Sequence, residues 1–199
     1  EWMKDEYNDL VSKGFDWKPP VIGGPSTGRA IIDGKKRIML CANNYLSMSN
    51  HPKVKQAAID AVKSHGAGSG SVRPIAGNMD IHNELEETIA RFKNREAALY
   101  YQTGFAVNSG LIPQLAGKND SIISDQLNHG SIIDGVRLSS VKKENRTIYA
   151  HNDMGELEDR LKEATKKCEK TLLISDGVFS MDGDIAPLDQ ITKLAREYG

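Results

Sequence analysis

The sequence has 199 residues, 39% of them hydrophobic, which is enough for a sizeable core in one folded domain or in one and a half. Its 26 basic and 27 acidic residues nearly cancel, so charge favours neither nucleic acid nor an anionic membrane as a partner. No apolar run approaches the roughly 20 residues of a membrane span, residues 1–6 lack the apolar core of a signal peptide, and we expect a cytoplasmic protein.

Residues 1–52 are expected to form an N-terminal arm followed by a hairpin. A short helix is predicted over residues 2–13, and a segment rich in proline and glycine follows it. Asp33-Gly34 then separates two short strand patterns, at 29–32 and 36–40. This dipeptide accepts the positive φ angles of a tight turn, so residues 28–41 are predicted to be an antiparallel pair.

Residues 53–199 are expected to form the first part of a larger domain. Apolar residues recur with helical spacing after Pro52, and again from Ile81 to Phe92. Helices and strands then alternate, which predicts an α/β fold with a mainly parallel sheet and crossover helices. The expected order is strand 97–101, helix 105–116, strand 121–124, helix 130–138, strand 147–150, helix 154–166, strand 171–175 and helix 188–198.

Three loops follow predicted strands, at 102–105, 125–130 and 176–187. Ligands of open α/β sheets gather at the carboxyl ends of the strands, where these loops meet helix N-termini. The backbone amides near Gly104 could bind an anion, and His129 could stack or transfer a proton. Each feature also has a plain structural explanation as a turn or a helix cap.

Other motifs give no support to competing kinds of site. The glycine cluster that starts at Gly66 follows a helix, whereas a dinucleotide-binding fingerprint follows a strand. No Ser-His-Asp set can be proposed from spacing, and no His or Cys pair has the spacing of metal ligands, so no metal is expected. Cys41 and Cys168 predict neither a disulfide nor a zinc site. The remaining histidines, including His151, are interpreted as capping or surface residues.

Five segments taken together resemble one family, the α-oxoamine synthases, which are pyridoxal-phosphate enzymes of the aspartate-aminotransferase-like fold. The resemblance runs from about residue 28 to the end, with the motifs in the family's order and spacing. The segments are Cys41-Ala42-Asn43-Asn44-Tyr45-Leu46, the 66–77 loop with Ser71-Val72-Arg73, Thr103-Gly104-Phe105, Ser124-Asp125 through Asn128-His129 to Gly135, and Asp176-Gly177-Val178-Phe179-Ser180-Met181-Asp182-Gly183.

The resemblance implies a role for particular residues around pyridoxal 5'-phosphate. The amides of Gly104 and Phe105, with Thr103, would hold the phosphate. His129 would lie on the pyridine ring, contact the substrate and move protons. Ser180 would bond the phenolic oxygen, and Asp176 would support that loop. On the substrate side, Asn43 would bind the amino-acid carboxylate and Arg73 would line the acyl-CoA side.

The resemblance also implies a reaction, in which an amino acid loses its α-proton and attacks an acyl thioester. Val72-Arg73-Pro74 and the run from Asp176 to Gly183 are most similar to the glycine C-acetyltransferase branch, which joins glycine and acetyl-CoA into 2-amino-3-oxobutyrate. The alternative is the 8-amino-7-oxononanoate synthase branch, with alanine and pimeloyl thioester.

The family's Schiff-base lysine and pyridinium-pairing aspartate correspond to positions after residue 199, so we expect this chain alone to be inactive. A catalytically silent subunit of a related heterodimer is a second alternative. Relatives form active sites between two subunits, which implies a homodimer.

Overall fold

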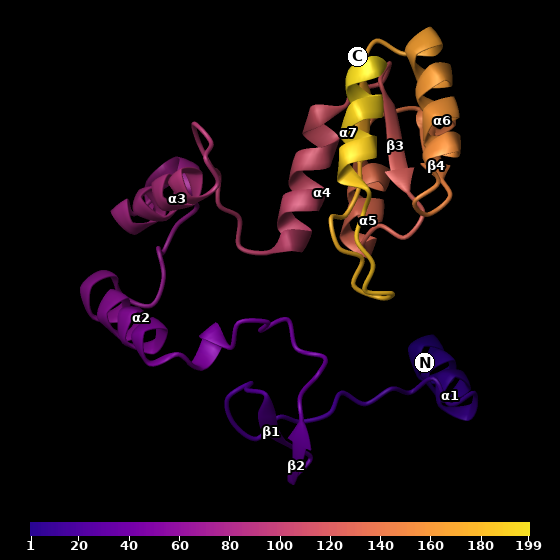
Figure 1. Ribbon diagram of the computed structural model, residues 1–199. Helices are drawn as coiled ribbons and strands as arrows, with labels where there is room; N and C mark the ends of the chain where they lie inside the picture. The colour runs from indigo at the N-terminus through magenta and orange to yellow at the C-terminus, as the bar shows by residue number, and fades with distance from the viewer. The chain divides into compact units, whose positions relative to one another are not determined.

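The computed structural model describes residues 1–199 and divides into two compact units, residues 1–83 and 84–199 (Figure 1). The unit boundary lies further along the chain than residue 52, where the arm and hairpin segment was expected to end, and that division stays a prediction. None of the helices combines the length and the apolar character that a membrane span requires.

The first unit contains the expected hairpin. Ile32 pairs with Lys35 at its closed end, and both Asp33 (φ 48°) and Gly34 (φ 74°) adopt positive φ angles, as a type I′ turn requires. The expected helix at the N-terminus and the helix after Pro52 are also present. The elements are α1 (Trp2–Ser12), β1 (Arg29–Ile32), β2 (Lys35–Ile38), the 3-10 helix η1 (Met48–Asn50), α2 (Pro52–His65), the π-helix η2 (Arg73–Gly77) and α3 (Asp80–Phe92), which crosses into the second unit.

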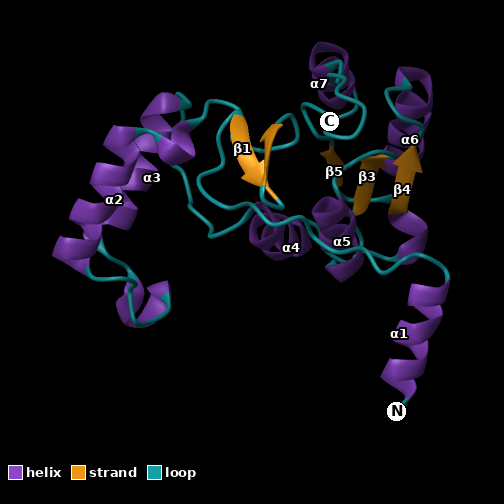
Figure 2. Cartoon of the chain, turned by 90° about the horizontal axis from the view of Figure 1, so that it is seen from below, coloured by secondary structure: helices purple, strands orange, loops and turns teal.

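The second unit is a parallel three-stranded sheet covered by helices. Strand β3 is central and bonds β4 on one side and β5 on the other. Figure 2 shows α4 and α5 on one face of this sheet and α6 and α7 on the other. The α/β class with a parallel sheet is thus confirmed. The elements are α4 (Gly104–Leu115), β3 (Ser121–Asp125), α5 (Gly130–Leu138), η3 (Lys143–Asn145), β4 (Arg146–Tyr149), α6 (Met154–Lys167), β5 (Thr171–Ile174) and α7 (Leu188–Glu197).

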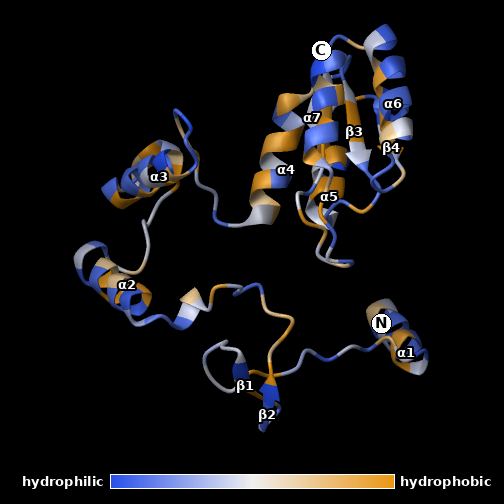
Figure 3. Cartoon of the chain, viewed as in Figure 1, coloured by the Kyte–Doolittle hydropathy of each residue, from blue (hydrophilic) through white to orange (hydrophobic).

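The sheet separates two hydrophobic cores, because successive residues of a strand point to opposite faces. Ile122 packs with Ile112 of α4 and Ile132 of α5, whereas Ile123 packs with Leu157 of α6 and Ile191 of α7. Figure 3 shows hydrophobic residues along much of α4, and more polar ones on α6. These two cores hold the helices against the sheet and thereby set the position of each helix N-terminus relative to the strands.

The expected strand at 97–101 is wrong. These residues form neither strand nor helix, and Leu99 is 67% exposed. A strand requires backbone partners, and the N–H of Tyr100 instead donates to Oε1 of Glu86 at 2.9 Å. An apolar run such as this one becomes a buried strand only where a neighbouring strand can pair with it, and here no such strand is present.

Asp153 is the N-cap of α6. Asp153 Oδ1 accepts the N–H of Glu156 at 2.9 Å, as a helix cap does. The carboxylate of Glu156 accepts the N–H of Ala150 at 2.8 Å, which ties the end of β4 to the first turn of the helix. The Glu156 side chain therefore fixes the loop between strand and helix instead of closing a reciprocal capping box.

Candidate functional site

The candidate site lies at the carboxyl edge of the three-stranded sheet. Because β3, β4 and β5 are parallel, their ends bring together the loops 126–129, 150–153 and 175–187. In Figure 1 the arrow of β3 points to the lower edge of this unit, where α4 also begins. This is the edge at which the sequence places its anion-binding and proton-transfer candidates.

The start of α4 offers two backbone donors. Thr103 is the N-cap, with its side-chain oxygen accepting the N–H of Ala106 at 3.0 Å. The N–H groups of Gly104 and Phe105 have no acceptor within the helix, because they belong to its first turn. No atom lies within 4 Å of where a Cβ on Gly104 would stand. The helix dipole favours an anion at this open position.

His129 is the N-cap of α5 and stands one loop away from the end of β3. Its Nδ1 accepts the backbone N–H of Ser131 at 3.1 Å and lies 2.7 Å from the Ser131 hydroxyl. That hydroxyl in turn accepts a bond from Asn108 of α4, at 2.9 Å. When Nδ1 accepts the Ser131 N–H, the neutral ring carries its proton on Nε2; in the other tautomer Nδ1 donates to the Ser131 hydroxyl. The chain of bonds also ties His129 to α4, which carries Gly104.

Asp176 and Asn128 connect the first loop to the end of β5. The Asp176 carboxylate accepts the N–H of His129 at 2.7 Å, and the Asp176 N–H donates to Oδ1 of Asn128 at 2.7 Å. The buried Asn128 amide donates to the Ser124 hydroxyl and to the Ile174 carbonyl, both at 2.9 Å. Asp176 thus supports His129 directly. Asn128, for which no role was predicted, holds the two loops together.

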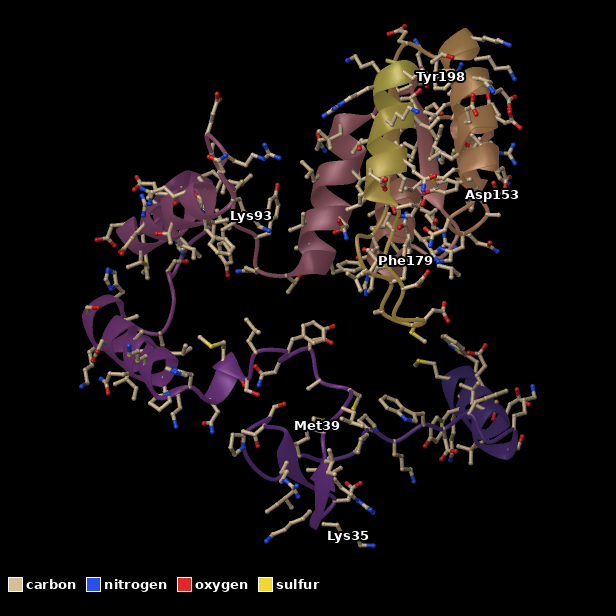
Figure 4. All side chains as sticks on the ribbon, viewed as in Figure 1. Lys35, Met39, Lys93, Asp153, Phe179 and Tyr198 are labelled. Atoms are coloured by element: carbon tan, nitrogen blue, oxygen red, sulfur yellow. The ribbon has the colours of Figure 1, made fainter.

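Ser180 lies in a tight turn after β5. The turn is closed by a bond from the N–H of Phe179 to the carbonyl of Asp184 at 2.9 Å, and by one from Gly183 back to Phe179 at 2.8 Å. Phe179 is buried, whereas Ser180 is exposed. Figure 4 labels Phe179 at the lower edge of the unit. The role of Ser180 toward a cofactor stays a prediction.

Asn43 and Arg73 belong to the first compact unit, and their roles at the substrate also stay predictions. Asn43 is exposed in the segment between β2 and η1. Arg73 begins the π-helix η2, where its Nε donates to Oδ1 of Asn78 at 2.9 Å. The backbone is tight here, because a Cβ on Gly77 would lie 2.0 Å from the carbonyl oxygen of Ser71.

A polar cluster that was not predicted from the sequence lies at the same sheet edge, centred on His151. This residue is not a simple capping or surface histidine, since its ring lies between the carboxylates of Asp125 and Asp184. The available signal was positional: Asp125 ends β3 and His151 follows β4, so both had to reach one edge. The contact of His151 with Asp184, which lies on the turn after β5, could not be predicted from the spacing of residues in the sequence.

Comparison with known proteins gives one family. Residues 35–199 match the family model described as aminotransferase class I and II. The chain is 51% identical over 199 residues to an 8-amino-7-oxononanoate synthase of Alkaliphilus metalliredigens, covering all of this chain and 50% of that protein. The chain therefore spans about half the length of the curated relatives that it matches.

Two solved structures give the same picture. A serine palmitoyltransferase from S. paucimobilis with bound PLP matches with a TM-score of 0.88 and 31% identity, over 100% of this chain and 50% of that one. An 8-amino-7-oxononanoate synthase from Francisella tularensis matches with a TM-score of 0.64 and 30% identity, over 77% of this chain and 41% of that one. The fold, the resemblance to α-oxoamine synthases and the cofactor of that family, pyridoxal 5'-phosphate, are thereby confirmed.

Proposed function

Since the chain belongs to the aminotransferase class I and II family, and within it to the pyridoxal-phosphate-dependent α-oxoamine synthases, we propose that the whole protein condenses alanine with a pimeloyl thioester, as an 8-amino-7-oxononanoate synthase does. The observation that carries the chemistry is the meeting of the α4 amides, His129 and Asp176 at one sheet edge. The observation that favours this substrate pair is the identity of 51% over the whole chain.

The residues present fit a phosphorylated pyridine. The amides of Gly104 and Phe105 face open space at a helix N-terminus, which suits a phosphate dianion. His129 offers a flat, exposed ring whose orientation is fixed through Nδ1. When bound, pyridoxal phosphate serves as the sink for the negative charge that develops on the amino acid's α-carbon. We propose that Thr103, Gly104, Phe105, His129, Asp176 and Ser180 hold it.

His129 is assigned the stacking and proton-transfer role. Proton transfer at Nε2 requires the tautomer in which Nδ1 carries the other proton and donates it to the Ser131 hydroxyl, 2.7 Å away. Nδ1 then keeps a Ser131 partner, so the ring need not rotate during the reaction. Asp176 keeps the His129 backbone in place. On the substrate side, Asn43 is assigned to the amino-acid carboxylate and Arg73 to the acyl thioester, and we propose that the enzyme acts as a homodimer.

Glycine C-acetyltransferase is the second candidate, favoured by Val72-Arg73-Pro74 and by the run from Asp176 to Gly183. Assaying the whole protein with alanine plus pimeloyl thioester, against glycine plus acetyl-CoA, separates the two. We expect kcat/KM to be at least about tenfold higher for the first pair, since one methylene in a fitted pocket discriminates by roughly 10- to 200-fold. A preference for glycine and acetyl-CoA would replace the first candidate by the second.

The phosphate assignment is tested at Gly104, the first residue of α4. Proline fits this position, because the preceding Thr103 is extended (φ −146°, ψ 156°), but it removes the amide donor. We expect Gly104→Pro to raise the Kd for pyridoxal phosphate by about tenfold or more, the worth of one hydrogen bond to a charged group. Gly104→Ala keeps the N–H and is the control. Equal affinities for the two variants, measured by absorbance titration, would exclude the amide of Gly104.

A further inference from the structure

His151 joins three separate segments at the sheet edge. Its Nδ1 lies 2.9 Å from Oδ1 of Asp125, the last residue of β3, and its Nε2 lies 2.5 Å from Oδ2 of Asp184, in the segment before α7. The Asp125 side chain is fully buried, and that of His151 is 20% exposed. A histidine that follows β4 therefore bridges the other two loops of the candidate site.

Both carboxylate oxygens already act as acceptors. Asp125 Oδ1 accepts the N–H of Leu127 at 2.8 Å, and Asp184 Oδ2 accepts the side-chain amide of Asn152 at 3.0 Å. A neutral imidazole has a single N–H and could satisfy only one of the two contacts. With both carboxylates ionised, both contacts are hydrogen bonds only when the ring is an imidazolium.

The ring also packs against the turn that presents Ser180. The Phe179 ring lies edge-on to His151, with centroids 4.4 Å apart and an interplanar angle of 83°. Phe179 and Asp184 are the two ends of this turn, joined by the backbone bond between them. His151 thus contacts both ends of the turn, and Ser180 lies between these ends.

We propose that His151 is a positioning residue for the cofactor site, which as an imidazolium fastens the Phe179–Asp184 turn to β3 and so sets the place of Ser180. The inference rests on the proposed function, because it assigns Ser180 to the cofactor. The new element is that His151 supports the turn carrying Ser180, and that it does so in the pH range in which its ring is protonated.

The charged surroundings of His151 give the direction of this pH dependence. The bond to Asp125, and next the bond to Asp184, raise the pKa of His151 above its ordinary 6.5, and His151 lowers the pKa of Asp184. Tyr149 of β4 stays neutral, because burial and the charge of Asp125 raise its pKa to about 12. A raised histidine pKa stabilises the fold fully below pH 6.5, and this contribution is lost as the pH rises through the raised value. We therefore expect the turn to loosen on the alkaline side.

The test uses the full-length enzyme and compares His151→Gln, Ser180→Ala and the double variant. We expect His151→Gln to raise the Kd for pyridoxal phosphate by about tenfold near pH 6.5, the order of one charge-assisted hydrogen bond. In the Ser180→Ala background the same change should add less than about twofold, because the two residues act in series. Equal effects of His151→Gln in both backgrounds would refute the inference.

A matched control distinguishes positioning from general stability. Tyr198, the C-cap residue of α7, donates to Oε1 of Glu158 of α6 at 2.7 Å and stands at the opposite edge of the unit from Phe179 (Figure 4). Tyr198→Phe should lower the melting temperature without changing cofactor affinity.

The pH dependence is a separate test. The Kd of the wild-type protein for pyridoxal phosphate should rise with pH over the range in which NMR shows His151 losing its proton. The same curve for His151→Gln should lack this step. A wild-type protein that binds no pyridoxal phosphate would contradict the proposed function itself, whereas binding without the step would contradict only the role of His151.

Discussion

Replacing His129 by alanine is expected to lower the turnover of the whole enzyme by about 100-fold or more, the lower end of what a positioned acid or base contributes. The same change should weaken the absorbance of the bound cofactor, because the flat ring proposed to lie against the pyridine is lost. Steady-state kinetics and an absorbance spectrum at saturating cofactor measure the two effects. Unaltered kinetics would contradict both parts of the role.

The alanine variant also loses a helix cap, so two further variants separate the effects. His129→Asn keeps a side-chain acceptor for the N–H of Ser131, and asparagine is among the best N-cap residues. It should fold like the wild type and still show the loss of turnover. His129→Phe keeps a ring without a proton to transfer, and should keep more of the cofactor absorbance than of the turnover. Full activity in His129→Asn would mean that His129 is only a cap.

Gly135→Ala is expected to lower the free energy of unfolding by about 3 kcal/mol, at the upper end of the usual cost of overpacking. A Cβ at Gly135 would lie 2.4 Å from the carbonyl oxygen of Asn108 and 2.9 Å from Cδ1 of Ile112. The first of these atoms is backbone, so α4 and α5 must move apart. Denaturant unfolding of the whole protein measures the change.

Gly130 in the same helix is the matched control. No atom lies within 4 Å of where its Cβ would stand, so Gly130→Ala should leave the free energy of unfolding within about 1 kcal/mol of wild type. In Gly135→Ala, separation of the two helices should also break the bond from Asn108 to Ser131 and weaken cofactor binding. If both alanine variants are equally stable, the close approach of the two helices is wrong.

The alternation of helices and strands from Gly104 onward could be predicted from the sequence, because each element carries its own periodicity and caps. The segment 97–101 shows the limit of this reasoning. Its apolar residues have the composition of a buried strand, but pairing depends on a second strand that a local pattern cannot supply. The apolar stripes of the helices after Pro52 predicted helix formation correctly and could not say what covers them.

In the candidate site, too, local sequence patterns predicted some residues, whereas residues that depend on distant partners were missed. His129 and Asp176 could be selected because each follows a strand, and parallel strands end at one edge. Gly104 could be selected because it begins a helix, although the strand expected before it is absent. Asn128 had no predicted role, and His151 was interpreted as a capping or surface residue, because their contacts depend on partners far along the chain. These partners are the Ile174 carbonyl for Asn128 and Asp184 for His151. The choice between alanine and glycine came from overall identity to relatives instead of from a single motif.

The central position of β3 has a consequence for synthesis on the ribosome. Ser121 pairs with Thr171, so one edge of β3 stays without its partner until about fifty further residues have been made, a delay of a few seconds at 5–20 residues per second. During that time Ile122 and Ile123, both fully buried in the finished fold, lie on a strand that only β4 can pair. The unpaired edge leaves the nascent chain open to aggregation and to capture by chaperones, and translation pauses between residues 150 and 170 would lengthen that exposure.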